Sequence, residues 1–178
     1  ALIPLPILPL QILFLNLVTD IFPALALGMG EGDEHIMKEP PRDPKEPLLS
    51  RRRWLGIAGY GAVITLSVLG ALLYATHGLG YESGEAVSVS FLTLAFAQLF
   101  HVFNMRDKGS AFINNEITRN PYVWGALALC ALLIAAAVYL KPLAEVMKII
   151  PPGADGWTLI AVMSLVPLAL GQILKAFR

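Results

Sequence analysis

The sequence predicts an all-α protein: a polytopic membrane helix bundle with five transmembrane helices. Of its 178 residues, 56% are hydrophobic and only 15% are charged, whereas about a quarter of the residues of a soluble domain are charged. The apolar residues gather into five runs, each close to the ~20 residues that a helix needs to cross a bilayer. Net charge is zero and no basic-aromatic pattern occurs, so we expect no nucleic acid partner.

The five expected spans cover about residues 7–28, 54–76, 86–105, 122–140 and 156–174, and we treat 1–178 as one membrane domain. Lys and Arg set the orientation of such a chain, because they are enriched on the cytoplasmic side. Eleven of the thirteen lie in the connections 29–53 and 106–121 or in the C-terminal tail. We therefore expect these two loops and the C-terminus in the cytoplasm, and the N-terminus outside.

The first span carries the most informative polar residues. Asn16, Thr19 and Asp20 interrupt it at helical spacing, which predicts that their oxygens share one face. An ionisable residue at membrane depth is costly and by default marks an ion path. Pro23 has no N–H and crowds the carbonyl of the fourth residue before it, so the turn around Thr19 should be loosened. Side-chain oxygens beside a loosened turn predict a cation site; the alternative is a structural acid paired with another helix.

The third span is the second polar one. Gln98, His101 and Asn104 step by three and form a drifting polar stripe. For His101 and Asn104 we expect interhelical hydrogen bonds. Gln98 lies deeper, and two interpretations stay open: a structural hydrogen bond, or a neutral oxygen that faces the cation path.

Small residues in the spans predict close packing. Gly56, Gly59, Gly61 and Gly70 should form a seam along the second span. The single cysteine, Cys130, excludes an internal disulfide and is expected to be a small buried residue.

Two stretches together resemble a known family. Asn16-Leu17-Val18-Thr19-Asp20, followed by Pro23-Ala24 and Ala26-Leu27-Gly28, resembles the sixth transmembrane helix of P-type cation ATPases of the calcium-pump subfamily. Ile36-Met37 and the stretch Pro40-Pro41-Arg42-Asp43-Pro44-Lys45-Glu46-Pro47-Leu48-Leu49-Ser50 resemble that family's loop between helices six and seven. The number and order of the later spans fit helices seven to ten, so the resemblance covers the whole chain.

The resemblance implies roles for individual residues. Asn16, Thr19 and Asp20 would be cation ligands. Two-site pumps of the family carry an acid in helix eight where this sequence has Gln98, which favours one divalent cation per cycle. Calcium is the expected cation, with manganese or sodium as alternatives. Arg42 and Lys45 would belong to a coupling loop that docks against a cytoplasmic domain; a plain solvated connector is the other interpretation.

The resemblance also shows what these residues lack. The phosphorylated Asp-Lys-Thr-Gly motif of the family does not occur, and neither do its nucleotide domain, its actuator domain or its first five helices. The chain alone therefore should not hydrolyse ATP; ATP and magnesium would bind only in cytoplasmic domains of a longer parent ATPase. Those domains, the remaining helices and the lipid bilayer are the expected partners, in the plasma membrane of a prokaryote.

Two other classes of protein remain open from the sequence. One is a stand-alone membrane-packing or regulatory module without transport. The other is part of a secondary transporter, although the five spans show no inverted repeat by eye.

Overall fold

The computed structural model describes residues 5–30, 50–106 and 114–176. Most of the polar loop 29–53 is not among them. The expected coupling residues Arg42 and Lys45 thus lie outside the described residues.

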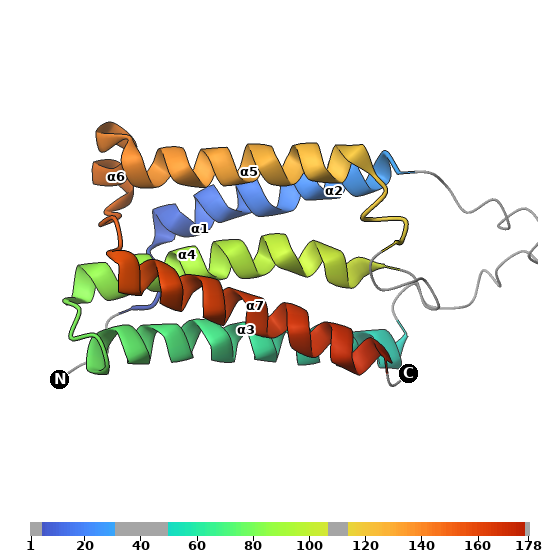
Figure 1. Ribbon diagram of the computed structural model, residues 1–178, viewed down its shortest axis with the longest axis horizontal. Coiled ribbons are helices and arrows are strands. Elements are labelled where there is room, and N and C mark those ends of the chain that lie inside the picture. Colours follow the sequence, from blue (N-terminus) through green and yellow to red (C-terminus); the bar gives the residue numbers. More distant parts are fainter. Residues whose placement is uncertain (1–4, 31–49, 107–113, 177–178) are drawn as a thin grey trace, which may run out of the picture.

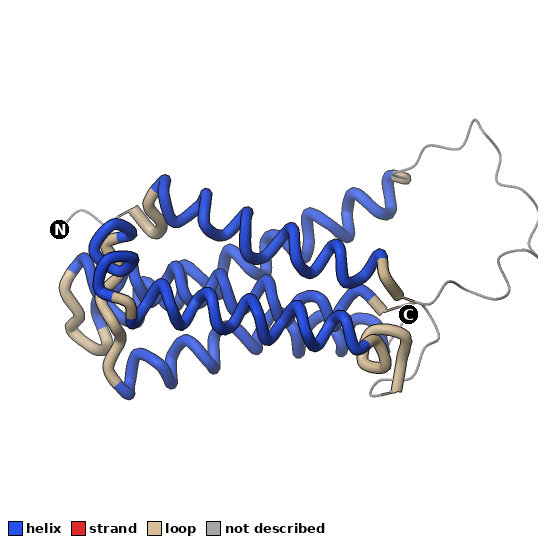
Figure 2. The backbone as a smooth tube through the Cα atoms, turned by 90° about the horizontal axis from the view of Figure 1, so that it is seen from above, coloured by secondary structure: helices blue, strands red, loops and turns tan. Residues whose placement is uncertain are grey.

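Five helical spans in the described residues are long and apolar enough to cross a membrane, and they contain no strand: Pro9–Gly28, Arg53–His77, Ser83–Met105, Pro121–Tyr139 and Ala154–Leu174. The prediction of an all-α, five-span bundle is confirmed. The spans run side by side along one long axis in two perpendicular views (Figures 1 and 2). Helix α1 begins and helix α7 ends at opposite ends of the bundle, as an odd number of spans requires (Figure 1).

The first span is made of three segments and the others of nearly continuous helices. In chain order the elements are α1 (Pro9–Leu15), the π-helix η1 (Asn16–Ile21), α2 (Phe22–Gly28), α3 (Arg51–His77), α4 (Ser83–His101) with its 3-10 extension η3 (Val102–Met105), α5 (Pro121–Tyr139), the short α6 (Lys141–Met147) and α7 (Ala154–Ala176).

Helix α4 is the centre of the bundle. Of its span, 67% is buried inside the protein, against 22–33% for the other four spans. The first span and α5 lie on one side of it, and α3 and α7 on the other (Figure 1). A polar residue on α4 is therefore placed mainly against protein.

The helices approach one another through small side chains. Several alanines have no exposed surface, among them Ala71, Ala75, Ala86, Ala95 and Ala137. Such contacts stabilise the bundle by close packing, because in lipid there is little hydrophobic drive between helices. The predicted glycine seam is wrong for three of its four members within the described part of the chain. Only Gly70 faces another helix, whereas Gly56, Gly59 and Gly61 face open space.

Two side-chain amides fix the ends of the first span. Near its start, Gln11 is fully buried and its Nε2 donates to the carbonyl of Met147 at the end of α6, at 3.0 Å. Near its end, Nδ2 of Asn120 donates to the carbonyl of Ala26 at 2.9 Å. Interhelical bonds of this kind contribute about 0.6 kcal/mol each in a membrane. Together they anchor the first span to α6 and to the start of α5.

The contact between α4 and α7 leads to a stability prediction. Asn104, just after α4, donates from Nδ2 to the carbonyl of Pro167 at 3.2 Å, which confirms the interhelical bond expected for it. A Cβ on Gly171 would lie only 2.7 Å from Cγ of Asn104. Overpacking of this kind costs about 1–3 kcal/mol, more than the ~1 kcal/mol that Ala gains over Gly in a helix. Gly171→Ala should therefore lower the unfolding temperature.

Thermal unfolding of the detergent-solubilised protein, followed by tryptophan fluorescence, measures the effect. The control is Gly70→Ala, whose Cβ would make an ordinary 3.6 Å contact with Met163, so its unfolding temperature should stay the same or rise. Equal behaviour of the two variants would contradict the packing described here.

Candidate cation site in the first span

The first span loosens one turn before its proline. Residues Asn16–Ile21 form the π-helix η1, between the α-helical segments α1 and α2. Pro23 is buried and lies two residues after η1. It has no N–H to continue the α-helical pattern, and π-turns are among the local changes that rearrange backbone bonding around a proline in a membrane helix. The loosened turn predicted from Pro23 is thus present as a π-turn.

The three predicted ligands differ in exposure. Asn16 and Asp20 are exposed on the outside of the described bundle, whereas Thr19 is buried with 7% exposure. The sequence placed all three on one face because it assumed α-helical spacing. A π-turn carries more residues per turn, so Thr19 is turned inwards and the other two are not.

The hydroxyl of Thr19 lies among three oxygens. Its Oγ1 is 2.9 Å from the carbonyl of Leu15, 2.8 Å from Oε1 of Gln98 and 3.4 Å from Oδ1 of Asp20. A hydroxyl has one proton, so it can donate to only one of these acceptors at a time. The result is a cluster of oxygen atoms that joins the first span to the central helix α4.

The polar stripe of α4 divides into two groups. Gln98 belongs to the cluster around Thr19. Asn104 bonds instead to α7, and the ring of His101 lies 4.8 Å from the ring of Tyr60 on α3. Of the stripe, the structure thus brings only Gln98 to the candidate site.

The electrostatics of the site rest on one carboxylate. Asp20 forms no ion pair within the described part of the chain; its interaction there is with the hydroxyl of Thr19. No group of three or more His, Cys, Asp or Glu occurs among the described residues either. The available donors are therefore one carboxylate and neutral oxygens, a set that suits a hard cation such as calcium, magnesium or manganese.

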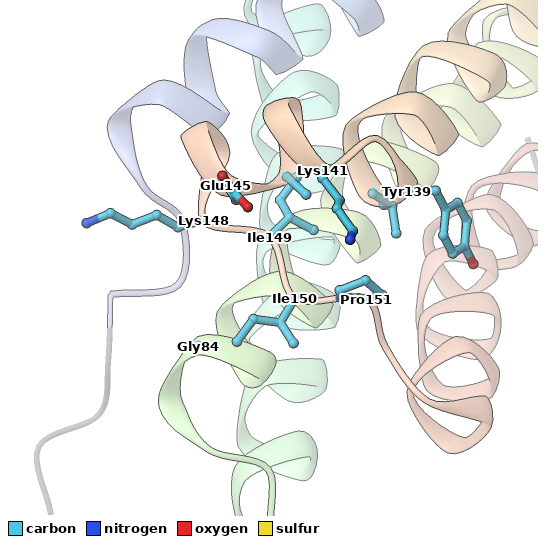
Figure 3. A pocket seen from close by; sticks show the side chains of 10 residues that line it. Gly84, Tyr139, Lys141, Glu145, Lys148, Ile149, Ile150 and Pro151 are labelled. Atoms are coloured by element: carbon cyan, nitrogen blue, oxygen red, sulfur yellow. The ribbon is translucent and has the colours of Figure 1, made fainter.

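A hollow with different chemistry lies elsewhere in the described bundle. It measures about 540 Å³ and opens between the start of α4, the end of α5 and α6 (Figure 3). It is mostly apolar, and its charged lining residues are Lys141, Lys148 and Glu145. Lys141 points towards Ile149 and Pro151, whereas Lys148 points away (Figure 3). None of the predicted ligands lines this hollow, and its two ammonium groups outnumber the one carboxylate of Glu145, which disfavours a cation.

Fold and site together define a class of protein. The described bundle has five membrane-length helices. The first interrupts its α-helix beside a carboxylate and shares an oxygen cluster with the central helix. This is the architecture of a membrane domain for cation transport. The chain belongs to the family described as "Cation transporting ATPase, C-terminus", whose model matches residues 4–177. The resemblance found in the sequence is confirmed.

Curated relatives agree with this family. A calcium-transporting ATPase of Bacillus subtilis is 35% identical over 168 residues, which cover 94% of this chain and 19% of the relative. Calcium-transporting ATPase 1 of Bacillus cereus is 30% identical over 188 residues, or 96% of this chain and 21% of the relative. A calcium-transporting ATPase of Listeria monocytogenes is 30% identical over 175 residues. The chain spans about a fifth of the length of these relatives.

Proposed function

We propose that this chain is the transport segment of an ATP-driven calcium pump and supplies part of an intramembrane cation site. Asp20 provides the charge, Asn16 and Thr19 provide neutral oxygens, and Gln98 lies beside Thr19 as a further oxygen. The observation that carries the proposal is the π-turn, which presents an acid next to the oxygen cluster and without an ionic partner among the described residues. The relatives' names support calcium as the cation.

The site is incomplete in this chain. Calcium takes six to eight oxygen ligands at about 2.3–2.6 Å, more than these side chains offer. Asn16 and Asp20 are exposed, and an acid exposed to lipid at mid-membrane costs about 2.5–3.5 kcal/mol. We infer that further helices of a parent ATPase cover this face and complete the shell. Those helices, the parent's cytoplasmic domains and the lipid bilayer are the partners we propose.

The energy source would lie outside these residues. They contain no Asp-Lys-Thr-Gly motif, so ATP and magnesium would bind in cytoplasmic domains of the parent. The distribution of Lys and Arg supports a cytoplasmic C-terminus and an outer N-terminus. The bacterial relatives support the plasma membrane of a prokaryote.

The first prediction about the site concerns its charge. Asp20→Asn in the intact pump keeps the size of the side chain and removes its charge, so cation-dependent phosphorylation by ATP should be abolished. The measurement is phosphoenzyme formed from labelled ATP with and without calcium, with manganese and sodium as parallel assays. Asp155→Asn, near the start of α7 and away from the cluster, is the matched control and should behave like the wild type. Undiminished calcium-stimulated phosphoenzyme in Asp20→Asn would refute the proposal.

The second prediction concerns stoichiometry. The resemblance puts Gln98 where two-site pumps of the family carry an acid, and the proposed site then has one carboxylate, so one calcium should bind per phosphorylation site. Equilibrium binding of radioactive calcium measures this ratio directly. Gln98→Leu should leave the ratio at one and weaken binding by up to about tenfold, as expected for the loss of one hydrogen bond. A ratio of two in the wild type would show that other helices supply a second site.

The third prediction concerns the loop. Arg42→Ala and Lys45→Ala should slow phosphoenzyme formation and leave equilibrium calcium affinity unchanged, because the loop would relay the signal without touching the ion. Rapid-quench phosphorylation and calcium binding separate the two quantities. Lys38→Ala, which removes a charge from the same loop, is the control and should be neutral. A changed affinity with normal kinetics would mean that the substitutions distort the site instead.

A further inference from the structure

The π-turn leaves one particular carbonyl without a donor of its own helix. In a π-turn, each N–H bonds to the carbonyl five residues earlier. The residue five after Val18 is Pro23, which has no N–H. Within η1 it is therefore the carbonyl of Val18 whose expected partner is missing. Val18 is completely buried, so neither water nor a lipid headgroup can replace that partner.

Cys130 supplies the missing donor. It lies in the middle of α5 and is also completely buried. Its Sγ is 2.9 Å from the carbonyl oxygen of Val18, and the thiol donates to it. A buried carbonyl left without any donor costs about 1–3 kcal/mol. The thiol thus compensates, from another span, for the N–H that Pro23 lacks.

This bond lies directly beside the proposed ligands. Val18 precedes Thr19 and Asp20, and the π-turn determines which of the three predicted ligands face outwards and which faces α4. If the turn reverted to α-helix, the same residues would wind more tightly and gain about one residue's worth of rotation. Asn16 would then rotate by roughly 100° relative to the residues after the turn. The geometry of the site therefore depends on whatever holds the π-turn in place.

We propose that Cys130 is a positioning residue of the cation site: its thiol holds the π-turn through the carbonyl of Val18. Only the expected effect of Cys130 on calcium binding rests on the function proposed above; the hydrogen bond to Val18 does not. Cys130 acts through the backbone and is not itself a ligand, because calcium prefers oxygen. The ordinary alternative is that Cys130 only fills space between α5 and the first span.

Two substitutions separate positioning from packing. Ser and Ala are close in size, but only Ser keeps a donor that reaches the carbonyl of Val18. Both are made in the full-length pump, and calcium-dependent phosphoenzyme formation is titrated with calcium. We expect Cys130→Ala to raise the half-saturating calcium concentration by about three- to tenfold, and Cys130→Ser to stay within about twofold of the wild type. Equal shifts in the two variants, or no shift in either, would overturn the proposal, since a packing role does not distinguish them.

Amide hydrogen exchange of residues 16–24 in the calcium-free protein gives a readout that does not depend on transport. Exchange there should be faster in Cys130→Ala and unchanged in Cys130→Ser. If the wild-type pump showed no calcium dependence at all, the proposed function would fail, and the exchange data would still decide whether the thiol holds the turn. Wild-type exchange in Cys130→Ala would overturn the positioning role under either result.

Discussion

The structure around the candidate site follows from a single constraint. A backbone carbonyl buried in a membrane needs a hydrogen-bond donor, and Pro23 has no N–H to supply one. In water such a carbonyl would bind solvent, but inside a bilayer the protein must supply the partner. The first span responds with a π-turn over Asn16–Ile21, and a thiol from α5 bonds to the carbonyl of Val18. The turn then determines that Asn16 and Asp20 face outwards while Thr19 faces the central helix.

The central helix makes this arrangement part of the bundle. Helix α4 is the most buried of the five spans. Gln98 on it is partly buried, and its Oε1 lies 2.8 Å from the hydroxyl of Thr19. The oxygen cluster therefore belongs to two helices at once. Gln11 and Asn120 anchor the two ends of the first span to α6 and to the start of α5. A shift of α4 relative to the first span would therefore change the cluster directly.

The exposure of Asp20 is the main constraint on how the described chain can form a site. Asp20 is an acid in an apolar span, has no ionic partner in the described part of the chain and lies on the outer surface of this bundle. Such a group is stable at membrane depth only beside a cation or a further polar surface. In the proposed function, the described chain would provide one wall of the cation site, with Asp20 as its single carboxylate.

The sequence by itself determined the fold class, the number of spans and the residues of the candidate site. Long apolar runs can satisfy their backbone in lipid only as helices, and the rare polar residues within them stand out. The structure decided how those residues are arranged. Helical spacing put Asn16, Thr19 and Asp20 on one face, but the π-turn moved Thr19 away from it, because the winding depends on backbone partners that sequence periodicity does not include. The seam expected along Gly56, Gly59 and Gly61 also failed, since spacing alone does not say which face of a helix meets a neighbour. The bond from Cys130 to Val18 joins residues 112 positions apart, and only tertiary packing brings such a pair together.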